Sequence, residues 1–98
     1  MNNERDFQSW LIKELKRRFP NCIVIKTDPT YIQGLPDLLI LYRNTWAALE
    51  VKKSEKAHHQ PNQEFYVSRM NDMSFAEFIW PEIADEILDA LEDYFNDI

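Results

Sequence analysis

Residues 35–53 read LPDLLILYRNTWAALEVKK, two apolar runs joined by the polar pair Arg43-Asn44. A short apolar run bounded by turn residues is typical of a strand that is buried on both faces. The stretch therefore predicts a hairpin, with one strand over residues 37–42 and its partner over 45–53. Successive side chains of a strand point to opposite faces, so we expect Glu50 and Lys52 to share one face.

This hairpin brings an acidic residue, Asp37, close to Glu50 and Lys52 on the neighbouring strand. Two carboxylates provide the hard oxygen ligands that Mg²⁺ prefers. A lysine beside them can orient an attacking water and offset the charge that develops on a phosphate. Asp after Pro is also ordinary turn chemistry, and Glu-x-Lys occurs on many solvated strands. In combination, on adjacent strands, the two motifs favour phosphodiester hydrolysis.

Length and composition bound the possible classes of protein. The chain has 98 residues, of which 45% are apolar and 29% charged, as expected for one globular domain. No apolar stretch is long enough to predict a transmembrane helix, so we expect no membrane partner. The single cysteine, Cys22, cannot form an internal disulfide, which favours a reducing cytoplasmic setting.

The net charge of −6 is unevenly distributed along the chain. Residues 81–98 carry seven acidic side chains and no basic one, which leaves eleven basic against ten acidic side chains in residues 1–80. An acidic C-terminal helix can therefore coexist with a positive surface elsewhere. The charge balance permits a nucleic-acid partner but does not predict one. The candidates for that positive surface are Lys13, Lys16, Arg17, Arg18, Lys26, Lys52, Lys53 and Lys56.

Hydrophobic periodicity predicts the remaining elements. We expect helices over residues 4–19, 61–71 and 82–95, and further strands over 22–26 and 75–79. The order predicts a small α/β sandwich with a mixed sheet and helices on both sides. A right-handed crossover through the second helix would place the last strand parallel to the Glu50 strand.

The two outer helices each carry an apolar stripe. In the first helix the stripe also includes Glu4 and Gln8, so we expect Glu4 to point toward the surface that the stripe covers. Glu4 near the N-terminus is equally suited to a structural role at the positive end of the helix dipole. The stripe residues are Phe7, Trp10, Leu11, Leu15 and Phe19 in the first helix, and Ile83, Ile87, Leu91 and Tyr94 or Phe95 in the last.

The chain resembles the PD-(D/E)xK nuclease superfamily and, more narrowly, the virus-type replication-repair nuclease family, whose compact versions occur in phages and bacteria. The residues that carry this resemblance span nearly the whole chain: Glu4 and Gln8, Gly34-Leu35-Pro36-Asp37-Leu38, Glu50-Val51-Lys52, Pro61-x-Gln63 and Phe65. The resemblance implies a restriction-endonuclease-like αβββαβ core with a mixed central sheet, followed here by a C-terminal helix.

The same resemblance implies a Mg²⁺- or Mn²⁺-dependent endonuclease that cuts DNA, often branched DNA such as Holliday junctions or flaps. Small stand-alone members are similar to junction-resolving enzymes that act as homodimers, so the resemblance implies a homodimer, and it implies products with 5′-phosphate and 3′-hydroxyl ends. Asp37 and Glu50 would bind the metal, with the Val51 carbonyl as a further ligand. Lys52 would be the catalytic lysine and Glu4 an additional acidic group. Gln63 would position the lysine or a phosphate, and the setting would be a bacterial or phage-infected cytoplasm.

Several polar residues beside these motifs are candidates for DNA contact. Tyr31 and Gln33 flank the entrance to Pro36-Asp37, and the polar segment after the hairpin is basic. The adjacent pair His58-His59 lacks the spacing of a helical zinc-ligand pair, which makes a zinc site a poor interpretation. The full set of nucleic-acid-binding candidates is Lys26, Tyr31, Gln33, Lys53, Lys56 and His58.

Two alternatives belong to other functional classes. One is a nucleic-acid-binding module that keeps the nuclease fold without cleavage, although binding alone would not require Asp37, Glu50 and Lys52 together. The other is a protein-interaction domain that acts through the acidic helix over residues 82–97.

Overall fold

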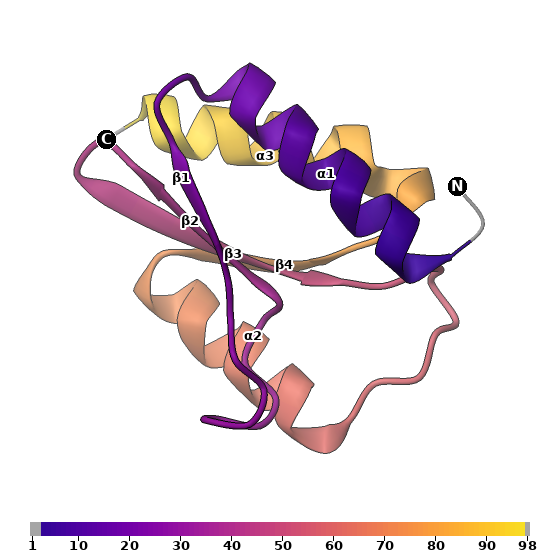
Figure 1. Ribbon diagram of the computed structural model, residues 1–98. Helices are drawn as coiled ribbons and strands as arrows, with labels where there is room; N and C mark the ends of the chain where they lie inside the picture. Colours follow the sequence, from indigo (N-terminus) through magenta and orange to yellow (C-terminus); the bar gives the residue numbers. More distant parts are fainter. Residues whose placement is uncertain (1–2, 98) are drawn as a thin grey trace.

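The computed structural model describes residues 3–97, and its elements follow the predicted order (Figure 1). Asn3 caps the first helix, since its side-chain oxygen accepts a hydrogen bond from the Asp6 N–H at 2.8 Å. The elements are α1 (Glu4–Arg18), β1 (Ile23–Lys26), β2 (Leu38–Tyr42), β3 (Thr45–Val51), α2 (Pro61–Met73), β4 (Phe75–Ile79), a 3-10 turn (Pro81–Ile83) and α3 (Ala84–Asn96).

The four strands form one mixed sheet in the order β1-β2-β3-β4. The predicted hairpin of β2 and β3 is confirmed, with Tyr42 opposite Thr45 at the turn and Leu38 opposite Leu49. The crossover through α2 makes β4 parallel to β3, as predicted. Continuing the β2–β3 register by one residue places Asp37 opposite Glu50, and this register positions the site described below.

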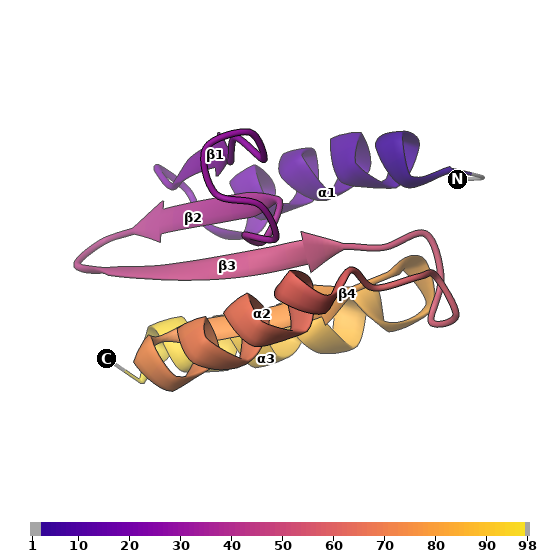
Figure 2. The ribbon, with the colours of Figure 1, turned by 90° about the horizontal axis from the view of Figure 1, so that it is seen from below.

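Helices cover both faces of the sheet, with α1 and α3 on one face and α2 on the other (Figures 1 and 2). The larger core lies under α1 and α3, where Leu11 of α1 packs with Leu38 and Leu49. The smaller core lies under α2, where Val67 packs against Ala48. Because side chains alternate along β3, Glu50 lies on the same face as Ala48, toward α2. Within residues 3–97, no helix is long and apolar enough to cross a membrane.

The predicted stripe of α1 is confirmed, although Trp10 is only half-buried. The predicted stripe of α3 lies on the covered side of the helix, but its first half is less buried than the neighbouring positions. Ala84 and Leu88 are buried, whereas Ile83 and Ile87 are half-buried, and Ile87 packs against the core. Ile83 belongs to the 3-10 turn at Pro81–Ile83 and not to the α-helix. Leu91 and Phe95 are buried, as expected.

The only glycine of the chain, Gly34, holds the loop between β1 and β2 against α2. Its φ is +96°, a region that side-chain-bearing residues rarely adopt, and a Cβ placed on it would lie 2.4 Å from the Cβ of Asn62. Thr27, at the start of this loop, donates its hydroxyl to the Pro36 carbonyl at 2.7 Å. The close approach of Gly34 to Asn62 and the hydrogen bond of Thr27 both hold the backbone that leads into Asp37.

We expect Gly34→Ala to lower the free energy of unfolding by about 2 kcal/mol or more, because it adds backbone strain and a clash with the first turn of α2. Urea denaturation monitored by tryptophan fluorescence measures the loss. The matched control is Gln33→Ala, an exposed neighbour in the same loop, which should change stability by no more than about 0.5 kcal/mol. Equal stability of the Gly34→Ala and wild-type proteins would contradict the role assigned to the glycine.

Candidate metal and catalytic site

Asp37 and Glu50 are joined across the β2–β3 hairpin by hydrogen bonds to each other's strands. The Asp37 N–H donates to Glu50 Oε1 at 3.2 Å, and the Val51 N–H donates to Asp37 Oδ2 at 3.0 Å. Glu50 is only 2% exposed and Asp37 is half-buried. The strand register thus holds two carboxylates together in a largely water-excluded place.

Lys52 is 6% exposed, and its ammonium is surrounded by acceptors. Nζ donates to Gln63 Oε1 at 2.8 Å and to the His58 carbonyl at 2.9 Å, and it lies 3.6 Å from Glu50 Oε2. The Lys52 N–H donates to the Ile79 carbonyl at 2.9 Å, which continues the β3–β4 pairing past Val51. Glu50 and Lys52 therefore share a face, as the spacing predicts.

Gln63, in the first turn of α2, links the lysine to the glutamate. Its Oε1 accepts from Lys52 Nζ and also from the Gln60 N–H at 2.9 Å, while its Nε2 donates to Glu50 Oε2 at 2.9 Å. The donors on one side and the carboxylate on the other fix the orientation of the amide. The structure thus brings four of the predicted site residues together: Asp37, Glu50, Lys52 and Gln63.

Two backbone groups of the site are not among the residues predicted from the sequence. The His58 carbonyl leaves no signal in the sequence, because any residue type supplies a carbonyl. The Gln60 N–H has a weak signal, since a glutamine three residues after a helix N-cap often reaches back to the N-cap backbone. Gln60-Pro61-Asn62-Gln63 has that spacing.

The two carboxyls resist ionising together. Burial raises the pKa of Glu50 to about 8, and the adjacent negative charge of Asp37 adds to the increase, while Lys52 opposes it. Burial likewise raises the pKa of Asp37, although the hydrogen bond from the Val51 N–H stabilises the ionised form and lowers this pKa in part. Without a further cation, the pair therefore retains a proton at neutral pH.

The donor set fits a hard divalent cation such as Mg²⁺. Each carboxylate oxygen has two lone pairs, so the bonds from the protein leave capacity for a metal. Mg²⁺ is usually bound through one or two carboxylates together with waters and substrate phosphates, and its charge would replace the retained proton. Across residues 3–97, no three His, Cys, Asp or Glu side chains are grouped as metal ligands. Asp37 and Glu50, with the Val51 carbonyl as the expected backbone ligand, would hold such a cation.

Glu4 is not brought together with this pair. It is exposed in the first turn of α1, whose apolar stripe packs on the face of the sheet away from α2, whereas Glu50 points toward α2. The structural alternative, a favourable position at the positive end of the helix, agrees with the placement of Glu4 and Asp6 in the first turn. Gln8 is half-buried on the same helix.

Five of the six predicted DNA-contacting residues lie on the segments that lead into and out of the site. Tyr31 and Gln33 are exposed in the loop that precedes Asp37, and Tyr31 is 82% exposed. Three more, Lys53, Lys56 and His58, are exposed in the segment that leaves the same end of β3. Lys26 is exposed at the end of β1, but it is opposite Leu38, so its side chain lies on the α1–α3 face, away from the site.

The wider positive surface predicted from the sequence does not form as one patch. Arg17 donates to Glu14 at 2.8 Å, and Arg18 pairs with Asp89 of α3 at 2.7 Å. Lys52 is buried in the site. The remaining α1 lysines lie on the α1–α3 side of the sheet, opposite α2.

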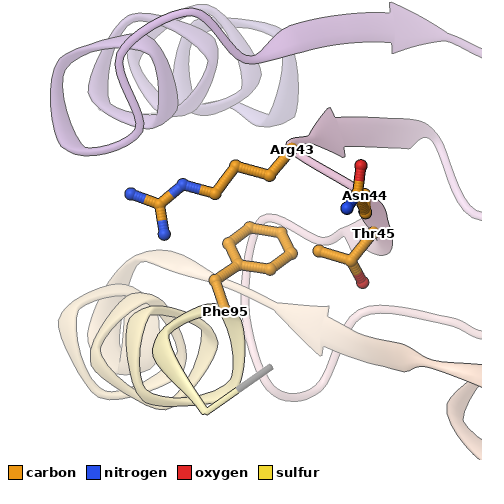
Figure 3. A pocket seen from close by; sticks show the side chains of 4 residues that line it. All are labelled: Arg43, Asn44, Thr45 and Phe95. Atoms are coloured by element: carbon orange, nitrogen blue, oxygen red, sulfur yellow. The ribbon is translucent and has the colours of Figure 1, made fainter.

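Shallow hollows occur at both ends of the sheet. One, of about 250 Å³, lies next to the site between the loop before Asp37 and the start of α2, lined by Gln33, Gln60, Pro61 and Asn62. Another, of about 150 Å³, lies between the β2–β3 turn and α3, lined by Arg43, Asn44, Thr45 and Phe95 (Figure 3). Thr45 and Glu50 are five residues apart on one strand, about 17 Å, so the second hollow does not belong to the site.

Comparison with known proteins gives no independent support for a family, since no protein-family model matches the chain and a search of curated proteins finds no match.

Proposed function

We propose that this protein is a Mg²⁺- or Mn²⁺-dependent DNA endonuclease. One observation carries the proposal: Asp37, directly before β2, is held against Glu50 of β3, with the Lys52 ammonium 3.6 Å from Glu50 Oε2. A buried acid pair with a raised pKa is a costly arrangement, and such arrangements are common at functional sites. The acid pair would bind a divalent cation, and the cation together with Lys52 would bind a phosphate.

The side chains have separate roles in the proposed reaction. Asp37 and Glu50 bind the cation, which when present supplies Lewis-acid polarisation of a phosphate oxygen and lowers the pKa of a water. Lys52 orients the attacking water and offsets the negative charge that builds on the phosphate. Its contact with Glu50 is the longest of its three polar contacts, so it is the one most easily exchanged for substrate. Gln63 is a positioning residue, since it holds Lys52 and Glu50.

The surface around the site suits a DNA backbone better than the net charge suggests. Lys53, Lys56 and His58 flank it on one side, and the loop with Tyr31 and Gln33 lies on the other. The acidic helix α3 lies on the opposite face of the sheet from α2 (Figure 1), so DNA that approaches the α2 face does not meet it. We extend the proposal to branched DNA, to a homodimer and to the cytoplasm of a bacterial or phage-infected cell, in line with the family resemblance.

Cleavage of end-labelled DNA tests the proposal. Linear, flap and four-way substrates are incubated with the protein in Mg²⁺, Mn²⁺ or EDTA. We expect strand cleavage with either cation, none in EDTA, and preference for the branched substrates. Sequencing gels of the products should show 5′-phosphate and 3′-hydroxyl ends. Cleavage that continues in EDTA would contradict the metal-dependent mechanism.

The same samples separate the proposal from the two alternatives. A binding module without catalysis would shift DNA in a gel in every buffer and cut it in none. A protein-interaction domain would neither shift nor cut DNA.

A further inference from the structure

The outer edge of β1 is open. β1 is the first strand of the sheet and pairs only with β2. Thr27 N–H bonds to the Asp37 carbonyl, so by the alternation of an antiparallel ladder Ile23 and Ile25 also direct their backbone groups toward β2. The N–H and C=O groups of Val24 and Lys26 therefore point outward. Among residues 3–97 no partner for these four groups is present.

Apolar side chains lie beside this open edge. Ile23 is 58% exposed and Ile25 is 40% exposed. Both lie on the face that carries α2, because they are opposite Leu41 and Leu39, and Leu39 is opposite Ala48. Helix α2 contacts β3 and β4 and does not extend over β1, in front of which only the loop between β1 and β2 is seen (Figure 2).

Native edge strands are usually blocked by a very short length, by charged side chains such as lysine, by proline or by bulges. β1 has only four residues and ends on Lys26, but it has no proline and its first three residues are apolar. Pairing along this edge therefore requires a strand that tolerates Lys26, and a second copy of β1 meets this requirement. In an antiparallel register centred on Ile25, Val24 is opposite Lys26 of the other copy, so Lys26 does not face its own charge.

We propose that two copies of this chain associate through β1, pairing the two strands antiparallel about a two-fold axis at Ile25. In this register the outward groups of Val24 and Lys26 form four backbone hydrogen bonds between the copies. Ile25 packs against Ile25 of the second copy at a non-hydrogen-bonded position, where side chains approach most closely. The interface is isologous, so it closes at two copies and does not propagate.

The dimer places both candidate sites on one side of a continuous eight-stranded sheet, because the axis is perpendicular to the sheet. Five strand spacings separate the two β3 strands, about 24 Å. Two cuts placed symmetrically in one branched DNA would use such a pair of sites, and this consequence rests on the proposed function. The association itself does not depend on cleavage and is tested without DNA.

Sedimentation of the full chain tests the association. A four-residue edge is smaller than a standard interface, so we expect a dimer that dissociates on dilution, with the midpoint on the order of 1 to 100 µM. Ile25→Lys places two ammonium groups at the axis and should weaken dimerisation at least about 30-fold. Met73→Lys is the matched control, since Met73 is 61% exposed on α2, and it should dimerise as the wild type does. A monomeric wild type at about 500 µM, or an unchanged Ile25→Lys dimer, would overturn the proposal.

Disulfide trapping tests the register. In a Cys22→Ser background, Ile25→Cys should cross-link to itself under mild oxidation, because the two positions face each other. Ile23→Cys in the same background would face Thr27 of the second copy and should not cross-link. Equal cross-linking of the two variants, or none from Ile25→Cys, would exclude the register centred on Ile25.

Discussion

Asp37→Asn is expected to reduce cleavage at least about 100-fold and, in the same protein, to stabilise the metal-free fold near pH 8. The two effects have one cause. The negative charge of Asp37 attracts a bound cation. Without a cation, the same charge repels the ionised form of Glu50 and raises its pKa. An asparagine can still accept from the Val51 N–H, and its amide can donate to Glu50. The substitution thus removes a charge and keeps the hydrogen bonds of the site.

The sign of the stability change follows from proton linkage. In the unfolded chain Glu50 loses its proton near its ordinary pKa of 4.5, whereas in the folded protein it keeps the proton up to about pH 8. Between these two values the folded protein therefore binds one proton more than the unfolded chain. Stability therefore falls as the pH rises through this interval. Removing the Asp37 charge lowers the pKa of Glu50 and reduces the fall. We expect a gain of about 1 to 2 kcal/mol near pH 8 and little change near pH 5.

Urea denaturation in EDTA, repeated near pH 5 and pH 8, measures this gain. Addition of Mg²⁺ should stabilise the wild type, because a ligand that binds only the folded state raises its stability, and should leave Asp37→Asn unchanged. Asp28→Asn is the matched control, since Asp28 is an exposed turn acid that accepts from Thr30. It should cut and unfold as the wild type does. An Asp37→Asn protein that is less stable than the wild type near pH 8 would contradict the claim that the Asp37 and Glu50 charges repel each other in the folded protein.

The sequence was sufficient for the elements and for most of the site because both depend on local patterns. The apolar run over 37–42 and the alternation around Glu50 define adjacent strands, and the turn at Arg43-Asn44 defines their register. Once Leu38 is opposite Leu49, the meeting of Asp37 and Glu50 follows. Gln63 was also placed correctly beside Lys52, although only its resemblance to a family motif indicated it.

The features that the sequence did not provide depend on packing between distant segments. The burial of Lys52 requires the His58 carbonyl, which reaches it only because the segment after β3 folds back over the strand. Ile83 lies in a 3-10 turn before α3 and not in the helix itself. The exposure of Glu4 depends on which face of the sheet α1 covers, and periodicity identifies a buried stripe without identifying what it packs against.

Lys52→Met is expected to give the largest loss of stability at this site, with a pH dependence opposite in sign to that of Asp37→Asn. The Lys52 charge lowers the pKa of Glu50, so it stabilises the fold most where Glu50 is ionised. Its removal raises the pKa of Glu50 further, so near pH 9 the folded protein must keep a proton that the unfolded chain has lost or hold a carboxylate without a cation. Near pH 5 Glu50 is a protonated, neutral acid in both proteins. We expect a loss of about 3 kcal/mol near pH 9 and about 1 kcal/mol near pH 5, measured in EDTA.

Lys53→Met is the control that isolates the buried ammonium. Lys53 is the next residue and is exposed, so this variant makes the same chemical change and should alter stability by no more than about 0.5 kcal/mol at either pH. In the cleavage assay, Lys52→Met should be inactive even in saturating Mg²⁺, because its water-orienting and charge-offsetting group is gone. A loss of stability that is equal near pH 5 and pH 9 would show that Lys52 acts by packing alone. Cleavage at the wild-type rate would remove Lys52 from the reaction.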